Sequence, residues 1–186
     1  MTCAAAPNVF TPEECTKIIG YWDEDVAVDA KTRPHGAQGN IKGDVSDTRV
    51  GKIQWLDAHE EEHYWILSRL AQAIIQINRE AFGIIIDGMM DQMQLTRYLP
   101  GDKYTWHEDA SNGIHRRRKL SFTLQLSDPS TFEGGGLEFN KGPIQEPGNQ
   151  LGALAVFPSF LMHQAIEVTK GERWALVGWF SGPEWR

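Results

Sequence analysis

The stretch RKLSFTLQLS, residues 118–127, alternates apolar and polar side chains with a period of two. Leucine or phenylalanine stands at Leu120, Phe122, Leu124 and Leu126, and a polar residue follows each of them. Successive side chains of a β-strand point to opposite faces, so this pattern predicts a strand with one apolar face.

Similar short runs, separated by turn residues, continue on both sides of this stretch. They lie at 91–98, 103–107, 136–139, 152–157, 163–168 and 173–180. Several short strands at this spacing predict a β-sandwich or barrel. Gly134-Gly135-Gly136 is expected to form a turn or bulge that leads into a strand.

The N-terminal half has a helical pattern. Thr11-Pro12-Glu13-Glu14 predicts a capped helix start, followed by a short helix to about Trp22. A second helix is expected from about Ala58 to Phe82, where apolar residues recur every three or four positions. Between them we expect a strand over 48–56, preceded by a long glycine-rich loop over 30–48 that can act as a lid.

Length and composition restrict the possibilities further. The 186 residues, 41% of them hydrophobic, suit one globular domain. We expect helices and supporting strands in 1–90 and a β core in 91–182, that is, a mainly β fold with supporting α-helices. With 18 basic and 25 acidic residues the net charge is −7, which argues against a nucleic acid or an anionic membrane as partner.

Two features predict a soluble protein of the cytoplasm. Cys3 and Cys15 are too few for a disulfide framework. The opening residues lack a basic segment followed by an unbroken apolar run, and no stretch reaches the roughly 18 apolar residues of a membrane span. The oligomeric state stays open.

One group of residues predicts a metal site. His107 and Asp109 stand two positions apart at the end of an expected strand, so their side chains can reach one ion. His163 opens another expected strand. Two histidines and one carboxylate form the facial triad of non-haem Fe(II) oxygenases. Arg173, ten residues after His163, can hold a carboxylate through paired hydrogen bonds.

The surroundings of these residues resemble a known family. The matching stretches are YLPGDKYTWHED (98–109), RKLSFTLQLSDPSTFEGGGLEF (118–139) and GALAVFPSFLMHQAIEVTKGERWALVGWF (152–180). They are similar to the 2-oxoglutarate- and Fe(II)-dependent dioxygenases, in particular to the prolyl 4-hydroxylase-like and PKHD-type hydroxylase branch. The resemblance covers roughly 91–182, with a weaker match at 9–19. It implies a double-stranded β-helix, a jelly-roll or cupin-like barrel, with the N-terminal helices packed on its major sheet.

The resemblance also implies roles for single residues. His107, Asp109 and His163 correspond to the iron ligands, and Arg173 to the residue that binds the far carboxylate of 2-oxoglutarate. Tyr98 corresponds to a tyrosine that hydrogen-bonds this co-substrate. Gln125 stands where many relatives place a tyrosine on the same carboxylate, and its amide can donate a hydrogen bond to the co-substrate in place of that tyrosine.

The implied reaction uses Fe(II), 2-oxoglutarate and O₂, with ascorbate as a possible reductant. It hydroxylates an unactivated C–H bond of an amino acid residue or small molecule, prolyl 4-hydroxylation being one candidate, and it releases succinate and CO₂. Three residues are candidates for contact with a small-molecule, peptide or protein substrate: Arg118, Arg49 and Trp55. The structural alternatives are a solvated loop for Arg118 and a core position for Trp55.

Two other functions are alternatives to this one. The run His59-Glu60-Glu61-Glu62-His63 matches the H-E-x-x-H pattern of zinc metallopeptidases. It lacks a downstream third ligand, and carboxylates at a helix start also stabilise the helix dipole. The alternative is two partly buried histidines where the helix meets the sheet. The other function is a non-catalytic jelly-roll binding module, against which the complete triad argues.

Overall fold

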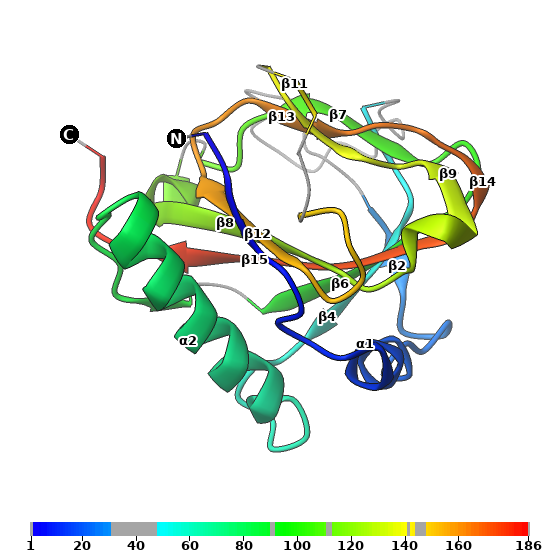
Figure 1. Cartoon of the computed structure of the whole chain (residues 1–186), viewed down its shortest axis with the longest axis horizontal. Helices are drawn as coiled ribbons and strands as arrows, with labels where there is room; N and C mark the ends of the chain where they lie inside the picture. The colour runs from blue at the N-terminus through cyan, green and yellow to red at the C-terminus, as the bar shows by residue number, and fades with distance from the viewer. Residues whose placement is uncertain are drawn as a thin grey trace.

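The computed structural model describes residues 2–30, 48–89, 92–110, 113–140, 142–143 and 148–185. The interior of the predicted 30–48 loop, and with it the proposed lid, lies outside these residues. In the described part, two sheets face each other across the barrel interior, and the helices cover the outer side of the larger sheet (Figure 1).

The larger, major sheet is antiparallel throughout. In spatial order its strands are β1 (Ala4–Ala6), β12 (Leu154–Pro158), β8 (Arg118–Gln125), β15 (Arg173–Ser181), β6 (Met93–Tyr98), β4 (Lys52–Leu56) and β2 (Val28–Asp29), and β5 (Gly88–Met89) pairs with β15. The N-terminal strands therefore share one sheet with the C-terminal strands. β1 was not predicted, because three alanines give no alternating pattern.

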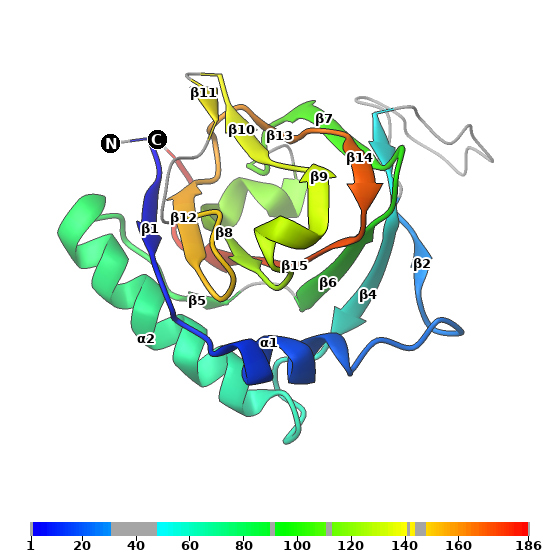
Figure 2. The same ribbon diagram turned by 45° about the vertical axis from the view of Figure 1, so that its right-hand side comes forward.

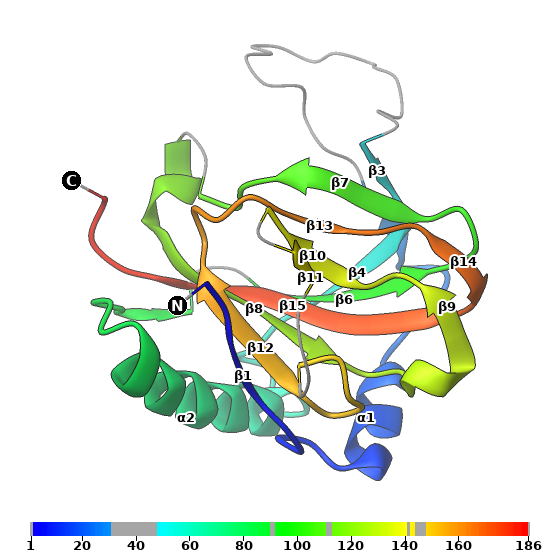
Figure 3. The same cartoon turned by 45° about the horizontal axis from the view of Figure 1, so that its top comes forward.

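A smaller sheet and a two-stranded ribbon close the barrel (Figure 2). The smaller sheet has the order β11 (Gly142–Pro143), β10 (Leu137–Phe139), β13 (His163–Ala165), β7 (Lys103–His107) and β3 (Arg49–Val50). The ribbon pairs β14 (Val168–Gly171) with β9 (Phe132–Gly134). Figure 3 shows the smaller sheet facing the major sheet, with the helices on the far side of the major sheet. The predicted jelly-roll with its supporting helices is confirmed.

The two 3₁₀ helices and several strand limits refine the prediction. The 3₁₀ turns are η1 (Gly113–Arg117) and η2 (Pro129–Thr131). The strand expected over 48–56 is broken at Gly51, whose φ is +144°, and its two parts join different sheets. The expected turn at Gly134-Gly135-Gly136 links β9 to β10, as predicted.

Helix α1 (Pro12–Ile19) begins with the predicted capping box. Thr11 Oγ1 accepts a hydrogen bond from the backbone N–H of Glu14, and the Glu14 carboxylate accepts one from Thr11 N–H. The helix ends at Ile19, with Gly20 as its C-cap, three residues before the predicted end at Trp22.

Helix α2 (Tyr64–Ala81) begins six residues later than predicted. The Asp57 carboxylate accepts a hydrogen bond from the backbone N–H of His59, and the Asp57 carbonyl accepts one from Glu60 N–H. These local bonds hold residues 57–63 in turns, which compete with the first turn of a helix. Neither helix in the part of the chain that the structure describes has the length and apolarity that a membrane crossing would need.

The main core lies between the helices and the major sheet. One stripe of α2, containing Ile66, Leu70, Ile74 and Ile77, belongs to the same buried cluster as the apolar face of β8. Phe122 on that face is fully buried and lies opposite Gly178 of β15. A Cβ on Gly178 would lie 2.6 Å from the Phe122 ring, so the close approach of the two strands requires glycine there.

Candidate metal centre and co-substrate pocket

The smaller sheet brings together the two histidines of the predicted triad. His107 ends β7 and His163 begins β13, and the two residues face each other in the antiparallel register. Asp109 follows β7, with Oδ1 3.6 Å from His107 Nε2 and Oδ2 3.5 Å from His163 Nε2. All three ligand atoms lie within 4.8 Å of one another. The structure thus places the three predicted ligands around one point.

Both imidazoles are oriented by the backbone. His107 Nδ1 lies 2.8 Å from the carbonyl oxygen of Thr105, and His163 Nδ1 lies 2.8 Å from that of Leu161. A carbonyl can only accept, so in both rings Nδ1 carries the proton and donates it. This leaves the Nε2 lone pairs directed at Asp109, which is the arrangement that metal-binding histidines need.

Two serines that the sequence analysis did not identify position Asp109, and one of them contacts its carboxylate. Ser121 Oγ donates to Asp109 Oδ2 at 2.6 Å, and its only proton is thereby used. Ser159 Oγ, 2.9 Å from Ser121 Oγ, therefore donates to it. The Ser159 carbonyl also accepts the backbone N–H groups of Asp109 and Ala110. The polar positions of the alternating β8 pattern were the available signal for Ser121.

The protonation states suit a cation. Burial, reinforced by the neighbouring His163, lowers the pKa of His107 to about 4. Burial by itself would raise the pKa of Asp109, but His163, His107 and the Ser121 hydroxyl outweigh it and hold the pKa below its usual range. At neutral pH the centre therefore offers an ionised carboxylate and a neutral imidazole from His107, as metal binding requires.

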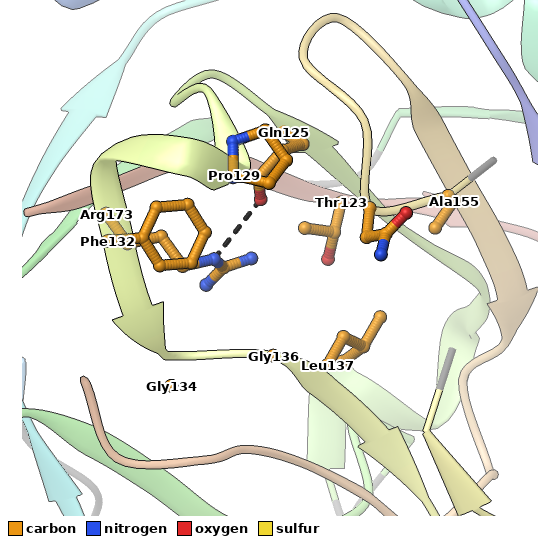
Figure 4. Close-up of a pocket in the computed structure, with 11 residues that line it drawn as sticks. Thr123, Gln125, Pro129, Phe132, Gly134, Gly136, Leu137, Ala155 and Arg173 are labelled. Atoms are coloured by element: carbon orange, nitrogen blue, oxygen red, sulfur yellow. Dashed lines mark hydrogen bonds between the residues drawn. The ribbon is translucent and has the colours of Figure 1, made fainter. Parts of the chain in front are cut away.

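A cavity of about 180 Å³ lies inside the barrel, next to the start of β15 (Figure 4). Its lining comes mainly from β8, β9, β10, β12 and β15: Thr123, Gln125, Pro129, Phe132, Gly134, Gly136, Leu137, Gly148, Asn149, Ala155 and Arg173. Arg173 is buried, and its guanidinium points into this space (Figure 4). Burial lowers the pKa of Arg173, but from so high a value that the group stays charged.

The glycine run before β10 makes room for Arg173. Gly135 has a φ of +64°, and a Cβ there would lie 2.9 Å from Arg173 Cδ and 2.8 Å from Val168 Cγ2. A larger residue at this position would displace the arginine side chain.

Gln125 contacts Arg173 directly. Arg173 Nε donates to Gln125 Oε1 at 3.2 Å, and Gln125 Nε2 donates to the Ser127 carbonyl at 3.0 Å. The amide therefore orients the guanidinium and leaves the two terminal NH₂ groups of Arg173 for other acceptors. Tyr98 lies opposite Arg173 in the register of β6 and β15, and its buried ring is 5.6 Å from the guanidinium carbon.

The three candidate substrate residues lie toward the other end of the strands. Arg49 donates from Nη2 to Gln94 Oε1 at 2.5 Å, and its guanidinium lies 4.6 Å from the centre of the Tyr104 ring. Arg118 is buried, with its guanidinium carbon 3.7 Å from the Trp179 ring. Trp55, 41% exposed, lies 6.5 Å from the same Trp179 ring.

The H-E-x-x-H run does not form the site that its pattern suggests. His59 and His63 both precede α2, so they do not share a helical face; His59 is exposed and His63 is buried. The expectation of two partly buried histidines is therefore wrong for His59. His63 Nδ1 contacts the Asp57 carbonyl at 2.9 Å. Among the residues that the structure describes, the ligand atoms of His63 group only with those of the exposed Glu60 and Glu62, so the peptidase interpretation is not favoured.

Comparison with known proteins identifies relatives of this chain. The family model of the 2OG-Fe(II) oxygenase superfamily matches residues 93–181. A PKHD-type hydroxylase from Picosynechococcus is 40% identical over 175 residues, covering 93% of this chain and 75% of that protein. One from Idiomarina loihiensis is 34% identical over 163 residues, covering 82% and 73%. One from Parvibaculum lavamentivorans is 41% identical over 91 residues, covering 46% of this chain. The chain spans only 39% of the length of that last relative.

Solved structures share the fold at low sequence identity. A prolyl-4-hydroxylase from Pseudomonas putida superposes with a TM-score of 0.68 at 22% identity, covering 97% of this chain and 93% of that one. A prolyl hydroxylase from Trichoplax adhaerens, in complex with a peptide fragment of the hypoxia inducible factor oxygen degradation domain, gives a TM-score of 0.74 at 17% identity, covering 97% and 83%. The segment matched by the family model includes all three triad residues and Arg173.

Proposed function

We propose a hydroxylase activity for this chain, which belongs to the 2OG-Fe(II) oxygenase superfamily and, within it, to the PKHD-type hydroxylases. Membership of this superfamily implies Fe(II), 2-oxoglutarate and O₂ as the participants. The proposed reaction hydroxylates an unactivated C–H bond while 2-oxoglutarate is converted to succinate and CO₂.

The observation that carries the proposal is the arrangement along the lumen side of β8. Ser121 at one position supports the His107–Asp109–His163 centre, and Gln125, four residues along, holds Arg173. Four residues of strand span roughly 13 Å. In the proposed complex a short dicarboxylic acid lies between these two positions, with one end at the metal and the other at the guanidinium.

The residues fit the implied participants chemically. Two imidazoles and one carboxylate are the donor set of non-haem Fe(II) sites, and they leave positions free for further ligands. When bound, Fe(II) supplies the oxidative step with O₂. In the described part of the chain no carboxylate pairs with Arg173, so its charge is available for the far carboxylate of 2-oxoglutarate. We propose that the Tyr98 hydroxyl donates a hydrogen bond to this carboxylate. We propose that Gln125 orients Arg173.

The substrate end of the lumen is assigned to Arg49, Trp55 and Arg118. A peptide is a reasonable substrate class, since the Trichoplax relative in fold was solved with a peptide, and a small molecule is the other. We further propose that residues 1–186 act as one unit with its catalytic core in 91–182. A cytoplasmic location and ascorbate as a reductant stay predictions from the sequence.

Succinate formation tests the proposal. The protein, supplied with Fe(II), 2-oxoglutarate and O₂, should release succinate, and Asp109→Ala should abolish this release because a metal ligand is lost. Asp25→Ala, which removes an exposed carboxylate far from the triad in sequence, serves as the control and should keep full turnover. His63→Ala should also keep turnover, whereas a peptidase centred on that residue would lose its activity. Full succinate release by Asp109→Ala, or none by the wild type, would contradict the proposal.

A further inference from the structure

Arg49 places a partly buried guanidinium close to the candidate metal centre. Its strand, β3, pairs with β7, so that Arg49 lies opposite Tyr104. The guanidinium carbon is 4.6 Å from the centre of the Tyr104 ring, and this ring stacks on His107 with 3.4 Å between ring centres. The positive charge therefore lies within about 8 Å of the centre of a metal-binding imidazole, as these two separations require.

Most of the hydrogen-bonding capacity of Arg49 is unused. A guanidinium has five N–H donors, and the described contacts use one of them, from Nη2 to Gln94 Oε1. Arg49 Nε is buried and has no hydrogen-bond partner. By contrast Arg69, Arg97 and Arg117 each form an ion pair with a carboxylate. Among the described residues no carboxylate pairs with Arg49.

The cation–π contact between Arg49 and Tyr104 does not use the unpaired N–H donors of Arg49. A cation–π contact uses the flat face of the guanidinium, whereas its N–H donors lie in the plane of the group. Nε is buried, but the unused N–H donors of the two terminal nitrogens thus remain open to an acceptor that approaches from the edge. A partly buried cation without a counter-charge is costly, and a bound anion removes that cost.

The site is separate from the one assigned to 2-oxoglutarate. Gln94, which contacts Arg49, lies opposite Val177, whereas Tyr98 lies opposite Arg173. These two positions on β6 are four residues apart, which is roughly 13 Å along the strand. A molecule held by Arg49 can therefore lie next to the metal while 2-oxoglutarate occupies the Arg173 pocket.

We propose that Arg49 binds a carboxylate of the substrate, so that the enzyme acts on an acid whose carboxylate lies only a few bonds from the hydroxylated carbon. The proposal rests on the hydroxylase function given above. Because Arg49 and His107 lie so close together, the carboxylate and the hydroxylated carbon must belong to one small molecule or to neighbouring residues of a peptide. Two sources fit: the α-carboxylate of a free amino acid, or an Asp or Glu side chain beside the reacting residue.

Calorimetric titration tests this without turnover. The protein is loaded with Zn(II), which is redox-inert, and saturated with 2-oxoglutarate. One arm titrates each free L-amino acid against its α-carboxamide. The other titrates blocked proline peptides with Asp or Glu on either side of the proline against the same peptides with Asn or Gln. In at least one arm we expect the acid to bind at least tenfold more tightly than its amide.

Variants then assign the preference to Arg49. Arg49→Gln should reduce the preference for the acid to less than twofold, and Arg49→Lys should keep part of it, since the charge remains but the paired hydrogen bonds are lost. Arg79→Gln removes an exposed arginine of α2 and should keep the full preference.

The outcomes separate this inference from the hydroxylase assignment. If the wild type binds neither metal nor 2-oxoglutarate, the proposed function fails. If it binds both, the carboxylate assignment alone is overturned by any of three results: no acid in either arm binds, acids bind no better than amides, or folded Arg49→Gln keeps the wild-type preference.

Discussion

Both faces of β8 are buried, but one face contributes to the hydrophobic core and the other to the candidate site. On one face Leu120, Phe122 and Leu124 pack in the core under the helices. On the other, Ser121 and Gln125 face the lumen, where they hold Asp109 and Arg173. Ser121 is as fully buried as Phe122, with no exposed surface. Alternation of apolar and polar residues therefore does not always separate core from solvent; here it separates a stabilising core from a buried site.

The difference has an energetic reason. Buried apolar side chains contribute through the removal of their surface from water, whereas buried polar ones lose hydration and must be hydrogen-bonded to remain there. Each polar group named on the lumen face of β8 has its partner in the site itself. Changes on the two faces should therefore separate stability from ligand binding.

Phe122→Ala should have the largest effect, on the apolar face. Removing a fully buried phenylalanine ring leaves a cavity against Gly178 and α2, and such changes cost about 3–5 kcal/mol of unfolding free energy. Urea unfolding measures the loss. The Zn(II) affinity of the folded protein should stay within about threefold of the wild type. A loss of metal affinity by orders of magnitude in folded Phe122→Ala would show that the two faces are not independent.

The apolar half of this comparison was largely predictable from the sequence. The period of two in 118–127 identified the β8 strand, and Thr11 to Glu14 identified the start of α1, because both signals are local. The start of α2 was not predictable in the same way. The side chain and carbonyl of Asp57 form turns with the residues that follow it, and these turns replace the first predicted helical residues.

Ser121→Ala should have an intermediate effect, on the polar face. It removes the hydroxyl that fixes the Asp109 carboxylate, and the loss of such a support commonly weakens metal binding 10- to 100-fold. Calorimetric titration with Zn(II) measures the affinity, and urea unfolding should show a smaller change than in Phe122→Ala.

Ser159→Ala is the graded control for that change. Its hydroxyl reaches Asp109 only through Ser121, so the loss of Zn(II) affinity should be smaller than in Ser121→Ala. If Ser121→Ala bound Zn(II) as tightly as the wild type does, this result would contradict a positioning role for Ser121.

On the polar side of this comparison, only residues whose spacing in the sequence is typical of a metal site could be predicted. The separation of His107 and Asp109, with His163 and Arg173 downstream, indicated a metal and carboxylate site, and the fold brings the triad together. Ser159 could not be found this way, because its contacts depend on the turn after β12 meeting the end of β7. Gln125 was recognised as a departure from the family, but its contact with Arg173 required the packing of β8 beside β15.

Gln125→Leu should have the smallest effect of the three. It removes the acceptor for Arg173 Nε and leaves that donor buried without a partner, so the guanidinium is less well oriented. We expect 2-oxoglutarate to bind about tenfold more weakly, which corresponds to about 1.4 kcal/mol. Calorimetric titration of the Zn(II)-loaded protein with 2-oxoglutarate measures this change.

Gln54→Leu gives the matched control on the helix side of the major sheet. Gln54 is also buried and also makes two hydrogen bonds, from Nε2 to the Tyr21 carbonyl and from Asp23 N–H to its Oε1. Its replacement should lower stability to a degree similar to Gln125→Leu while 2-oxoglutarate affinity is retained. If both variants weakened 2-oxoglutarate binding equally, the effect would be a general loosening of the barrel, and Gln125 would have no specific role in holding Arg173.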